Sequence, residues 1–478
     1  MEKILNFING EFVPTTHHLE NINPALGTIY GTLPRTEPEE VARAIDCAHK
    51  AFESWSKTEP QHRSDLLRKL GHLILKNTEI LARAESIDSG KPLSLARSIE
   101  IPRCAQNFFY FADALISFHG ESFRSHLQTI NYTQYSPLGV VAAISPWNLP
   151  LYLLTWKIAP ALAAGNTVVA KPSEMTPMTA FLLSKLALEA GFPPGVLNIV
   201  HGLGSETGQA LVSHPQIKAV TFTGSTATGR VLGQICAQQF KKVALEMGGK
   251  NANIIFADCD FEKALETTLR SSFQNQGQIC LCGSRIFIEK QIYDRFLNSF
   301  VEKTQRLVSG NPLDEKTQQG ALVSKEHLQK VMGFIDLAKK EGGKILCGGE
   351  RPQHSSDLAG GYFLQPTIIE NLSFLSPVNQ EEIFGPVVTV TPFSSEEELL
   401  KMVNSTKYGL SSSVWTSDIS KASRMANSIE SGIVWINTWM NRDLRTPFGG
   451  VKESGYGREG GMEALKFFSE VKNVCIQH

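Results

Sequence analysis

Residues 139–170 read GVVAAISPWNLPLYLLTWKIAPALAAGNTVVA, and this stretch decides the fold. Val140–Ile144 and Thr167–Ala170 are apolar runs with the length and β-branched content of buried strands. Residues 151–163, between them, have the length and composition of a buried helix. Prolines and Lys157 interrupt the stretch too often for a membrane span. We therefore expect a strand–helix–strand unit in the protein core.

The same alternation continues after residue 170. Further strands are expected at Val196–Val200, Ala219–Thr223 and Val243–Leu245, with helices at 177–190, 206–213 and 226–238. Strands that alternate with helices form parallel βαβ units, because a right-handed crossover returns each strand to the same sheet. The pattern predicts a doubly wound, Rossmann-like sheet, which binds ligands at the carboxyl ends of its strands.

A second strand–helix series begins near Gly248 and predicts a second α/β domain. Its expected strands are Asn253–Ala257, Arg285–Glu289, Lys344–Cys347, Thr367–Ile369, Val387–Phe393, Ser412–Thr416 and Gly432–Ile436. Its expected helices are 261–275, 291–307, 325–341, 395–405 and 418–428.

The flanking segments carry simpler signals. A hairpin turn is expected at Asn9-Gly10, followed by two long amphipathic helices, 39–56 and 63–86, before the main sheet. The C-terminal tail, residues 467–478, alternates like a strand but has no nearby partner in the sequence. We expect it to pair with the 125–135 segment, in its own chain or in another subunit.

Composition excludes several classes of partner. The 478 residues include 46 basic and 47 acidic side chains, for a formal net charge of -1. Such a balance gives no general attraction to nucleic acid or to an anionic membrane, so a small-molecule partner is favoured. The N-terminus lacks the apolar core of a signal peptide, and the eight cysteines are scattered. Both features predict a cytoplasmic protein with free thiols.

One cysteine stands in a segment suited to chemistry. Residues 272–285 read SFQNQGQICLCGSR and present Cys280 on a turn-rich stretch. An ionised thiol is a nucleophile, although most cysteines in a protein of this kind are small buried hydrophobes. Cys282 is expected to be one of these. A metal site is not expected, because no zinc-type Cys or His pair accompanies the two cysteines.

Two strand ends could bind a dinucleotide. Thr221–Gly229, with Gly224 and Ser225, follows a strand and opens a helix, whose free amide groups suit a phosphate. The alternative is an ordinary strand-to-helix turn. Lys171-Pro172-Ser173-Glu174 follows another strand, and its carboxylate could accept ribose hydroxyls and repel the extra phosphate of NADP. The alternative here is a solvated charge pair at the start of a helix.

Two further strand ends offer catalytic groups. In Ser145–Pro150, prolines fix the backbone around the Asn148 amide, as an oxyanion donor requires; the alternative is an asparagine bonded to its own loop. Glu246 ends a strand beside two glycines. It could act as a general base on water, or be a paired surface charge.

Seven motifs in order resemble the NAD(P)-dependent aldehyde dehydrogenase superfamily. They are PWN at 146–148, KPSE at 171–174, FTGS at 222–225, EMGGK at 246–250, NQGQIC at 275–280, EEIFGP at 381–386 and PFGG at 447–450. Met247 stands where the family usually has leucine, a conservative change. The motifs span most of the chain, so the resemblance is highly specific.

The resemblance implies a role for each motif. Cys280 would attack an aldehyde carbonyl, the Asn148 amide and the Cys280 backbone N–H would hold the oxyanion, and Glu246 would activate the water that releases the acid. The cofactor would be NAD rather than NADP. The residues implied to bind it are Trp147, Lys171, Ser173, Glu174, Gly224, Ser225, Glu382 and Phe384.

The resemblance also implies a domain plan. Residues 1–117 and 138–247 would form the NAD-binding domain, and 248–448 the catalytic domain. Segments 118–137 and 464–478 are similar to the strands by which family members bridge subunits. We therefore expect a homodimer or a homotetramer.

The sequence is similar to the branch of the family that oxidises muconate semialdehydes. Arg103 and Arg442 would hold a substrate carboxylate near Phe448, because a guanidinium group binds a carboxylate bidentately. The alternative for each arginine is an interdomain or surface salt bridge. Members of that branch often carry another arginine where Phe109 stands. Two other functions remain open: a general aldehyde dehydrogenase, and a non-catalytic dinucleotide-binding relative.

Overall fold

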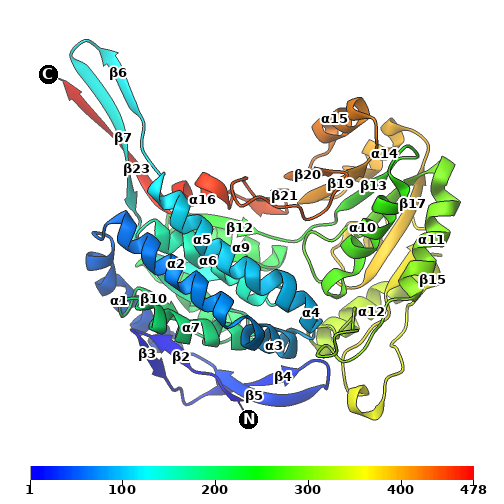
Figure 1. Cartoon of the computed structure of the whole chain (residues 1–478), viewed down its shortest axis with the longest axis horizontal. Helices are drawn as coiled ribbons and strands as arrows, with labels where there is room; N and C mark the ends of the chain where they lie inside the picture. Colours follow the sequence, from blue (N-terminus) through cyan, green and yellow to red (C-terminus); the bar gives the residue numbers. More distant parts are fainter. Residues whose placement is uncertain (1, 478) are drawn as a thin grey trace.

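The parallel sheet predicted from residues 139–245 forms the centre of the larger lobe in a computed structural model that describes residues 2–477 (Figure 1). The sheet has eight strands in the order β22-β12-β11-β8-β9-β10-β2-β3. The bounds are β2 Asn6–Ile8, β3 Glu11–Val13, β8 Val140–Ile144, β9 Thr167–Lys171, β10 Leu197–Ile199, β11 Ile217–Thr223, β12 Lys242–Glu246 and β22 Gly455–Tyr456. The five predicted strands run parallel, so the doubly wound sheet is confirmed.

Helices cover both faces of this sheet. On one face α2, α5, α6 and α7 share a single apolar cluster, and on the other face α1, α8 and α9 share a second. Their bounds are α1 Pro38–Trp55, α2 Pro60–Lys76, α5 Ile101–Ile116, α6 Pro150–Ala163, α7 Met178–Ala190, α8 Gln209–Ser213 and α9 Thr226–Gln238. The helix expected at 206–213 starts as a π-helical turn, η2 Gly204–Gly208.

The expectation of two helices before the sheet was wrong. The stretch 63–86 is broken at Asn77, whose backbone leaves the helical region and separates α2 from α3 Thr78–Ser89. A short α4 Leu93–Leu95, a π-helical turn η1 Ala96–Glu100 and then α5 follow. Pro102 does not disturb α5 because it lies in the first turn, where no N–H is needed.

The N-terminal hairpin is confirmed, and it joins the large sheet through an antiparallel pairing of β2 with β10. A small sheet beside it was not predicted. It consists of β1 Glu2–Lys3, β5 Thr28–Pro34 and β4 His18–Asn23, in that order. These strands pack a separate apolar cluster against α7.

The second α/β series forms a seven-stranded sheet in the order β15-β16-β17-β14-β13-β19-β20. The strands are β13 Ala252–Ile255, β14 Arg285–Glu289, β15 Lys344–Cys347, β16 Thr367–Glu370, β17 Val387–Phe393, β19 Ser411–Trp415 and β20 Ile433–Ile436. The helices are α10 Phe261–Phe273, α11 Tyr293–Gln305, α12 Lys325–Lys340, α13 Pro377–Gln380, α14 Glu396–Val403 and α15 Ile419–Ser428. All seven strands were predicted, and only β15 pairs antiparallel with its neighbour.

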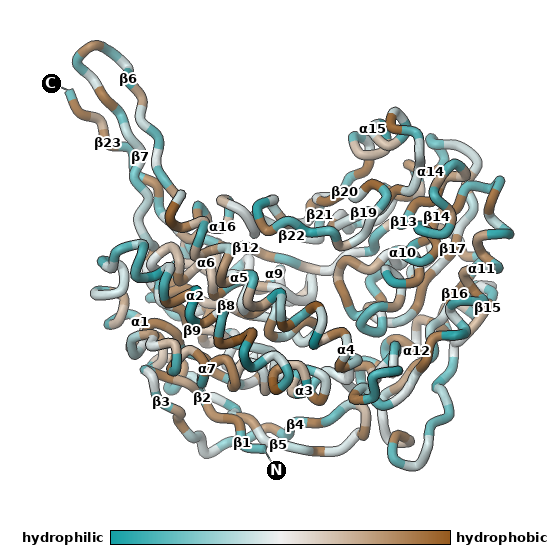
Figure 2. Tube along the Cα trace, viewed as in Figure 1, coloured by the Kyte–Doolittle hydropathy of each residue, from teal (hydrophilic) through white to brown (hydrophobic). Residues whose placement is uncertain are grey.

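A three-stranded arm projects from the body (Figure 1). It is built from β23 Ser469–Gln477, β7 Thr129–Pro137 and β6 Ser122–His126, in that order. The tail therefore pairs with the predicted segment, antiparallel and within the same chain. Apolar and polar residues are mixed along the arm (Figure 2). The helix α16 Gly461–Phe467 and the strand pair β18 Tyr408–Gly409 and β21 Val451–Lys452 complete the chain.

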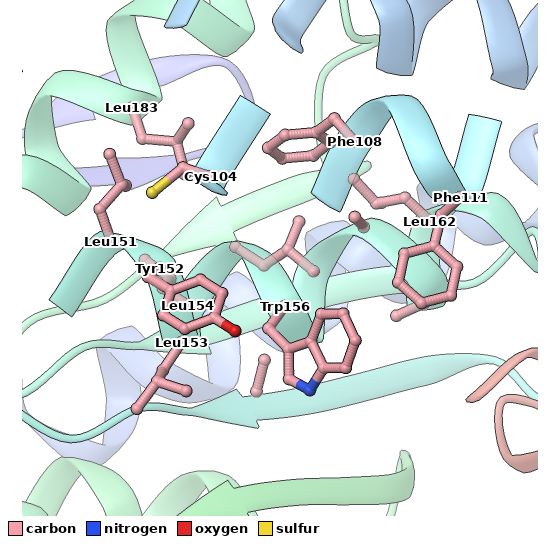
Figure 3. Packing of buried hydrophobic residues seen from close by; sticks show 14 of the residues in the cluster. Cys104, Phe108, Phe111, Leu151, Tyr152, Leu153, Leu154, Trp156, Leu162 and Leu183 are labelled. Atoms are coloured by element: carbon pink, nitrogen blue, oxygen red, sulfur yellow. The ribbon is translucent and has the colours of Figure 1, made fainter. Parts of the chain in front are cut away.

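The largest core lies around α6. All of its 14 residues are buried, because α6 packs between the sheet and α5. Figure 3 shows this packing, with Phe108 and Phe111 of α5 beside Leu162 and Trp156 of α6. Within residues 2–477, no helix is long and apolar enough to cross a membrane.

Candidate active site

The Cys280 segment follows α10 in an uncommon backbone conformation. Asn275, Gln276 and Gly277 all have positive φ, at 52°, 54° and 68°. For Asn and Gln this conformation costs free energy, so the surroundings must stabilise it. A side chain at Gly277 would also meet the carbonyl oxygen of Gly385, because an added Cβ would lie only 2.1 Å from it.

Amide side chains hold this turn in place. Gln276 Nε2 donates to the Ala321 carbonyl at 2.7 Å, and Gln278 Oε1 accepts from the Val323 N–H at 3.1 Å. Asn251 Nδ2 donates to the carbonyls of both Cys280 and Cys282, at 2.7 and 2.9 Å. The amides of the NQGQ motif thus support the backbone around Cys280.

A cavity of about 230 Å³ opens beside Cys280 at the carboxyl edge of the large sheet. It brings together seven of the predicted site residues, namely Trp147, Asn148, Gly224, Ser225, Cys280, Glu382 and Phe384; Glu246, at the end of β12, is not among its lining residues. Lys171, Ser173 and Glu174 are not among its lining residues. They lie at the end of β9, where Lys171 Nζ is 3.1 Å from Glu174 Oε2.

Asn148 is held from both ends. Its side-chain Nδ2 donates to the Gln278 carbonyl at 2.9 Å, in the segment that carries Cys280. Its backbone carbonyl accepts from Lys91 Nζ at 2.9 Å and from Asn275 Nδ2 at 3.0 Å. The amide therefore already faces the Cys280 segment, and its position is fixed before any ligand binds.

Beneath Asn148 lies a charged cluster that the sequence analysis missed. Lys91 is fully buried and bonds to the carboxylates of Glu85 and Glu100. Buried charges are costly unless they are paired and hydrogen-bonded, and Lys91 meets this condition by contacts with Glu85 of α3, Glu100 of η1 and the Asn148 carbonyl. The cluster therefore links α3 and η1 to the Asn148 loop. No local motif in the sequence signals it.

Glu246 ends β12 with a buried side chain, only 4% exposed. Within residues 2–477, neither of its carboxylate oxygens has a hydrogen-bond partner. Burial, reinforced by the charge of Glu459, raises the pKa of Glu246 well above its ordinary value. Because the pKa of this unpartnered carboxyl is raised, its ionised form is a stronger base than an ordinary glutamate.

The Cys280 thiol is also held neutral. Burial raises its pKa above the ordinary range, and the charges of Glu382 and Glu246 add to the effect. Forming the thiolate therefore needs a base or an added positive charge nearby. Cys282 is buried as predicted, and burial raises the pKa of its thiol to about 12.

Glu382 and Phe384 line the same cavity as Cys280. Glu382 Oε1 accepts from the Gly249 N–H at 2.9 Å, and burial raises the pKa of this carboxyl to about 7. Phe384 has a left-handed backbone, with φ at 63°, and its carbonyl accepts a 2.7 Å hydrogen bond from His327 Nε2. The ring of Trp147 packs edge-on against the rings of His327 and Phe384.

Two further residues of the cavity, His327 and Lys330, lie one turn apart on α12 and were not predicted from the sequence. Lys330 Nζ donates to the Glu382 carbonyl at 3.3 Å, so α12 supports two carbonyls of the Glu382–Phe384 segment. Burial lowers the pKa of His327 to about 4, so its ring is neutral and Nε2 carries the proton. Helical spacing alone did not indicate which loop this face of α12 would contact.

Comparison with known proteins identifies the family of this chain. A sequence profile described as the aldehyde dehydrogenase family matches residues 12–474. The chain belongs to this family. It is 50% identical to the 2-aminomuconic semialdehyde dehydrogenase of Danio rerio, over 99% of this chain and 98% of that protein. It is 41% identical to the 2-hydroxymuconic semialdehyde dehydrogenase of Pseudomonas putida, over the full length of both.

A solved structure of the family has the same fold. The NAD⁺ complex of an aldehyde dehydrogenase from Bacillus cereus superposes with a TM-score of 0.97 at 39% identity, covering 100% of this chain and 97% of that one. The chain is thus an enzyme of the NAD-dependent aldehyde dehydrogenase family. Within residues 2–477, no group of three or more His, Cys, Asp or Glu side chains is placed to hold a metal ion.

This aldehyde dehydrogenase has a second cavity, of about 270 Å³, on the other side of the Cys280 segment. Ile279 and Leu149, the sequence neighbours of Cys280 and Asn148, line it. So do Arg103 and Arg442, which the structure brings together: Arg103 Nη2 lies 3.4 Å from the Arg442 carbonyl.

The predicted substrate residues around Arg442 are in contact. The Arg442 guanidinium lies 4.0 Å from the centre of the Phe448 ring, and its Nη1 donates to the Tyr152 hydroxyl at 2.6 Å. Within residues 2–477, neither Arg103 nor Arg442 lies within salt-bridge distance of an Asp or Glu, whereas the neighbouring Arg445 pairs with Asp443. Phe109 faces away and packs on His72 of α2.

Proposed function

We propose that this enzyme oxidises a muconate-type semialdehyde, an aldehyde that also carries a carboxylate, with NAD as the acceptor. One observation carries the proposal: two arginines without a carboxylate partner line the cavity that adjoins the Cys280 segment. A guanidinium at a cavity wall favours a planar anion over a neutral chain. The names of the relatives, 2-aminomuconic and 2-hydroxymuconic semialdehyde dehydrogenases, point to the same substrate class.

In the proposed mechanism Glu246 takes the proton of the Cys280 thiol and passes it to solvent. Sγ then attacks the aldehyde carbon, and an S–C bond forms while the C=O π bond breaks and its oxygen becomes an oxyanion. The Asn148 amide and the Cys280 backbone N–H donate to that oxygen. A hydride then leaves the carbon, and a thioester remains on Cys280. Water attacks the thioester, Glu246 accepts its proton, and the S–C bond breaks to release the carboxylic acid.

The cavity beside Cys280 is suited to the nicotinamide part of the cofactor. A side chain at Gly248 would fill it, since an added Cβ would lie 2.2 Å from Glu382 Oε2, and the buried hydroxyl of Thr223 has no partner within residues 2–477. Glu382 and Phe384 would hold the nicotinamide ribose and ring. Bound NAD supplies the hydride acceptor.

The rest of the cofactor would follow the edge of the sheet. Trp147 and Ser225, with Gly224, would adjoin the pyrophosphate at the N-terminus of α9, where the helix dipole favours an anion and Ser225 is the N-cap. Lys171 and Glu174, with Ser173, would hold the adenosine ribose. The Glu174 carboxylate would repel the extra phosphate of NADP, so we expect NAD to be preferred.

The decisive experiment compares Arg442→Ala with the parent enzyme on adipate semialdehyde and on hexanal, which share a chain length and differ in the terminal carboxylate. We expect KM for the semialdehyde to rise about 10-fold to 100-fold, because a charge-assisted hydrogen bond is lost, with little change for hexanal. Arg445→Ala is the matched control, since Arg445 is exposed and paired with Asp443. Equal effects on both aldehydes would instead favour a general aldehyde dehydrogenase.

We also propose that the arm joins a second copy of the chain, as a homodimer or within a homotetramer. Phe123, Leu127 and Val471 on the arm are at least half exposed, so they offer apolar surface to a partner. Light scattering on the eluted enzyme measures the subunit number, and a monomer would refute the proposal. The domain boundaries at residues 117, 138, 247 and 448, and the cytoplasmic location, stay predictions from the sequence.

A further inference from the structure

The second cavity contains a hydroxyl group that the proposed mechanism does not use. Tyr152 lies in the first turns of α6 and is only 5% exposed, and it is one of the residues that line the cavity. Figure 3 shows its hydroxyl turned toward Trp156, one helical turn later. A buried phenol normally has a hydrogen-bond partner, so its contacts decide what it can do.

The partner of Tyr152 is a cation, and this fixes the direction of the bond. Arg442 Nη1 lies 2.6 Å from Tyr152 Oη, and a guanidinium can only donate. The phenol oxygen is therefore the acceptor, and its own O–H hydrogen remains available. Within residues 2–477, no protein atom accepts that hydrogen. A donor thus remains at the wall of the cavity, beside the guanidinium.

The Arg442 guanidinium is fixed mainly by aromatic rings. Its central carbon lies 4.0 Å from the Phe448 ring centre, 5.2 Å from that of Trp156 and 5.9 Å from that of Tyr152. Of its five N–H bonds, the one to Tyr152 is the only one with a protein acceptor within residues 2–477. Rings fix the plane of a guanidinium but not its rotation in that plane, so the Tyr152 bond sets that rotation.

We propose that Tyr152 and Arg442 form one carboxylate-binding unit, in which Tyr152 is a specificity-determining residue. The hydroxyl orients the guanidinium and donates its own hydrogen to the same carboxylate of the substrate. This inference rests on the proposed function and extends it, because it explains why a carboxylated aldehyde would be preferred by more than charge attraction. A neutral aldehyde gains neither contact.

The test is Tyr152→Phe, which removes one oxygen and keeps the ring that packs in the core. We expect kcat/KM for adipate semialdehyde to fall about 10-fold to 100-fold through KM, because a hydrogen bond to a charged group is lost. For hexanal the change should stay within about 2-fold, the size of a lost neutral contact. Tyr110→Phe is the matched control: Tyr110 packs on Phe111 and does not line the cavity, so both substrates should be unaffected.

A double-variant cycle shows whether the two residues act as a unit. If they do, Tyr152→Phe combined with Arg442→Ala loses clearly less than the product of the two single losses, because the shared carboxylate contact is lost only once. Losses that simply multiply would overturn the inference. An equal fall in kcat/KM for adipate semialdehyde and hexanal in Tyr152→Phe would also overturn the inference, since the hydroxyl would then serve the fold alone.

Failure of the proposed function would look different. In that case the parent enzyme itself would show no preference for adipate semialdehyde over hexanal. If the parent shows the preference and Tyr152→Phe keeps it, the substrate class stands and the role of Tyr152 is refuted. Both comparisons use the full-length enzyme with NAD and measure NADH formation.

Discussion

The two cavities on either side of the Cys280 segment are built in different ways. The one beside Cys280 and Glu382 lies at the carboxyl edge of the large sheet, and most of its lining residues belong to the short motifs predicted from the sequence. The one beside Arg103 and Arg442 is lined by residues from η1, α5, α6, the Cys280 segment and the loop after β20. The first cavity is suited to chemistry shared by a whole family, and the second to the choice of substrate.

This difference in construction separates the residues expected to carry the reaction from those expected to select the substrate. Strand ends converge on one edge of a sheet whatever the loops contain, so the fold itself places Asn148, Ser225 and Gly248 in the first cavity. Loops and helix faces can change without disturbing the sheet. Substitutions in the first cavity should therefore lower the turnover of every aldehyde, and those in the second should discriminate between aldehydes.

Loss of Cys280 should have the largest effect. Cys280→Ala removes the nucleophile, and we expect kcat to fall by at least about 10⁴-fold for any aldehyde. Cys282→Ala is the matched control, because Cys282 is buried two residues away and should retain most activity. The assay is NADH formation under saturating NAD. Substantial activity in Cys280→Ala would remove the covalent mechanism.

The Glu246→Gln change tests the base and has a predicted pH dependence. The pKa of Glu246 is raised, so the carboxylate that can accept a proton becomes more abundant as pH rises. We expect parent kcat to increase with pH where thioester hydrolysis limits the rate. Glu246→Gln should lower kcat about 10²-fold to 10⁴-fold and remove that part of the rise. A variant profile parallel to that of the parent would assign the base elsewhere.

Asn148→Ala should lower kcat somewhat less than Glu246→Gln does. Loss of one preorganised oxyanion donor lowers kcat about 10²-fold to 10³-fold, and KM should change little because the contact strengthens only as charge develops. Both aldehydes should be affected alike, which separates Asn148 from the residues of the second cavity. A large effect on KM with kcat preserved would mean that Asn148 binds substrate rather than the oxyanion.

The smallest effect in the first cavity is expected at His327. Removal of its bond to the strained Phe384 carbonyl in His327→Ala should raise KM for NAD about 10-fold, through a misplaced Phe384 ring. His354→Ala is the matched control, because His354 packs on Phe363 in a distant loop. KM for the aldehyde should not move in either variant. An unchanged KM for NAD would show that the left-handed Phe384 needs no support from α12.

The chain order of the strands in both large sheets could be predicted, and so could most of the residues that meet beside Cys280. Buried parallel strands are recognised in a sequence as short apolar runs, and the residues that follow them lie at the carboxyl edge of the sheet. The break at Asn77 and helix α5 were missed, because a local apolar period continues across a one-residue break and because a helix tolerates proline in its first turn. Phe109 shows the opposite limit. It lies on α5, the helix that carries Arg103, but its side chain packs on His72 of α2.

The sequence alone determined the α/β order, the strand-end motifs and the cysteine segment, because their signals are local runs of residue type. Only the tertiary structure placed Lys91 beneath Asn148, His327 behind Phe384 and Tyr152 against Arg442. These contacts join residues 57, 57 and 290 positions apart. No periodicity links such residues, since their contact depends on how the helices and loops pack around the two sheets. The NQGQIC segment, which ends at Cys280, depends on both. Its motif is local in the sequence, but its left-handed backbone is held by contacts from distant parts of the chain.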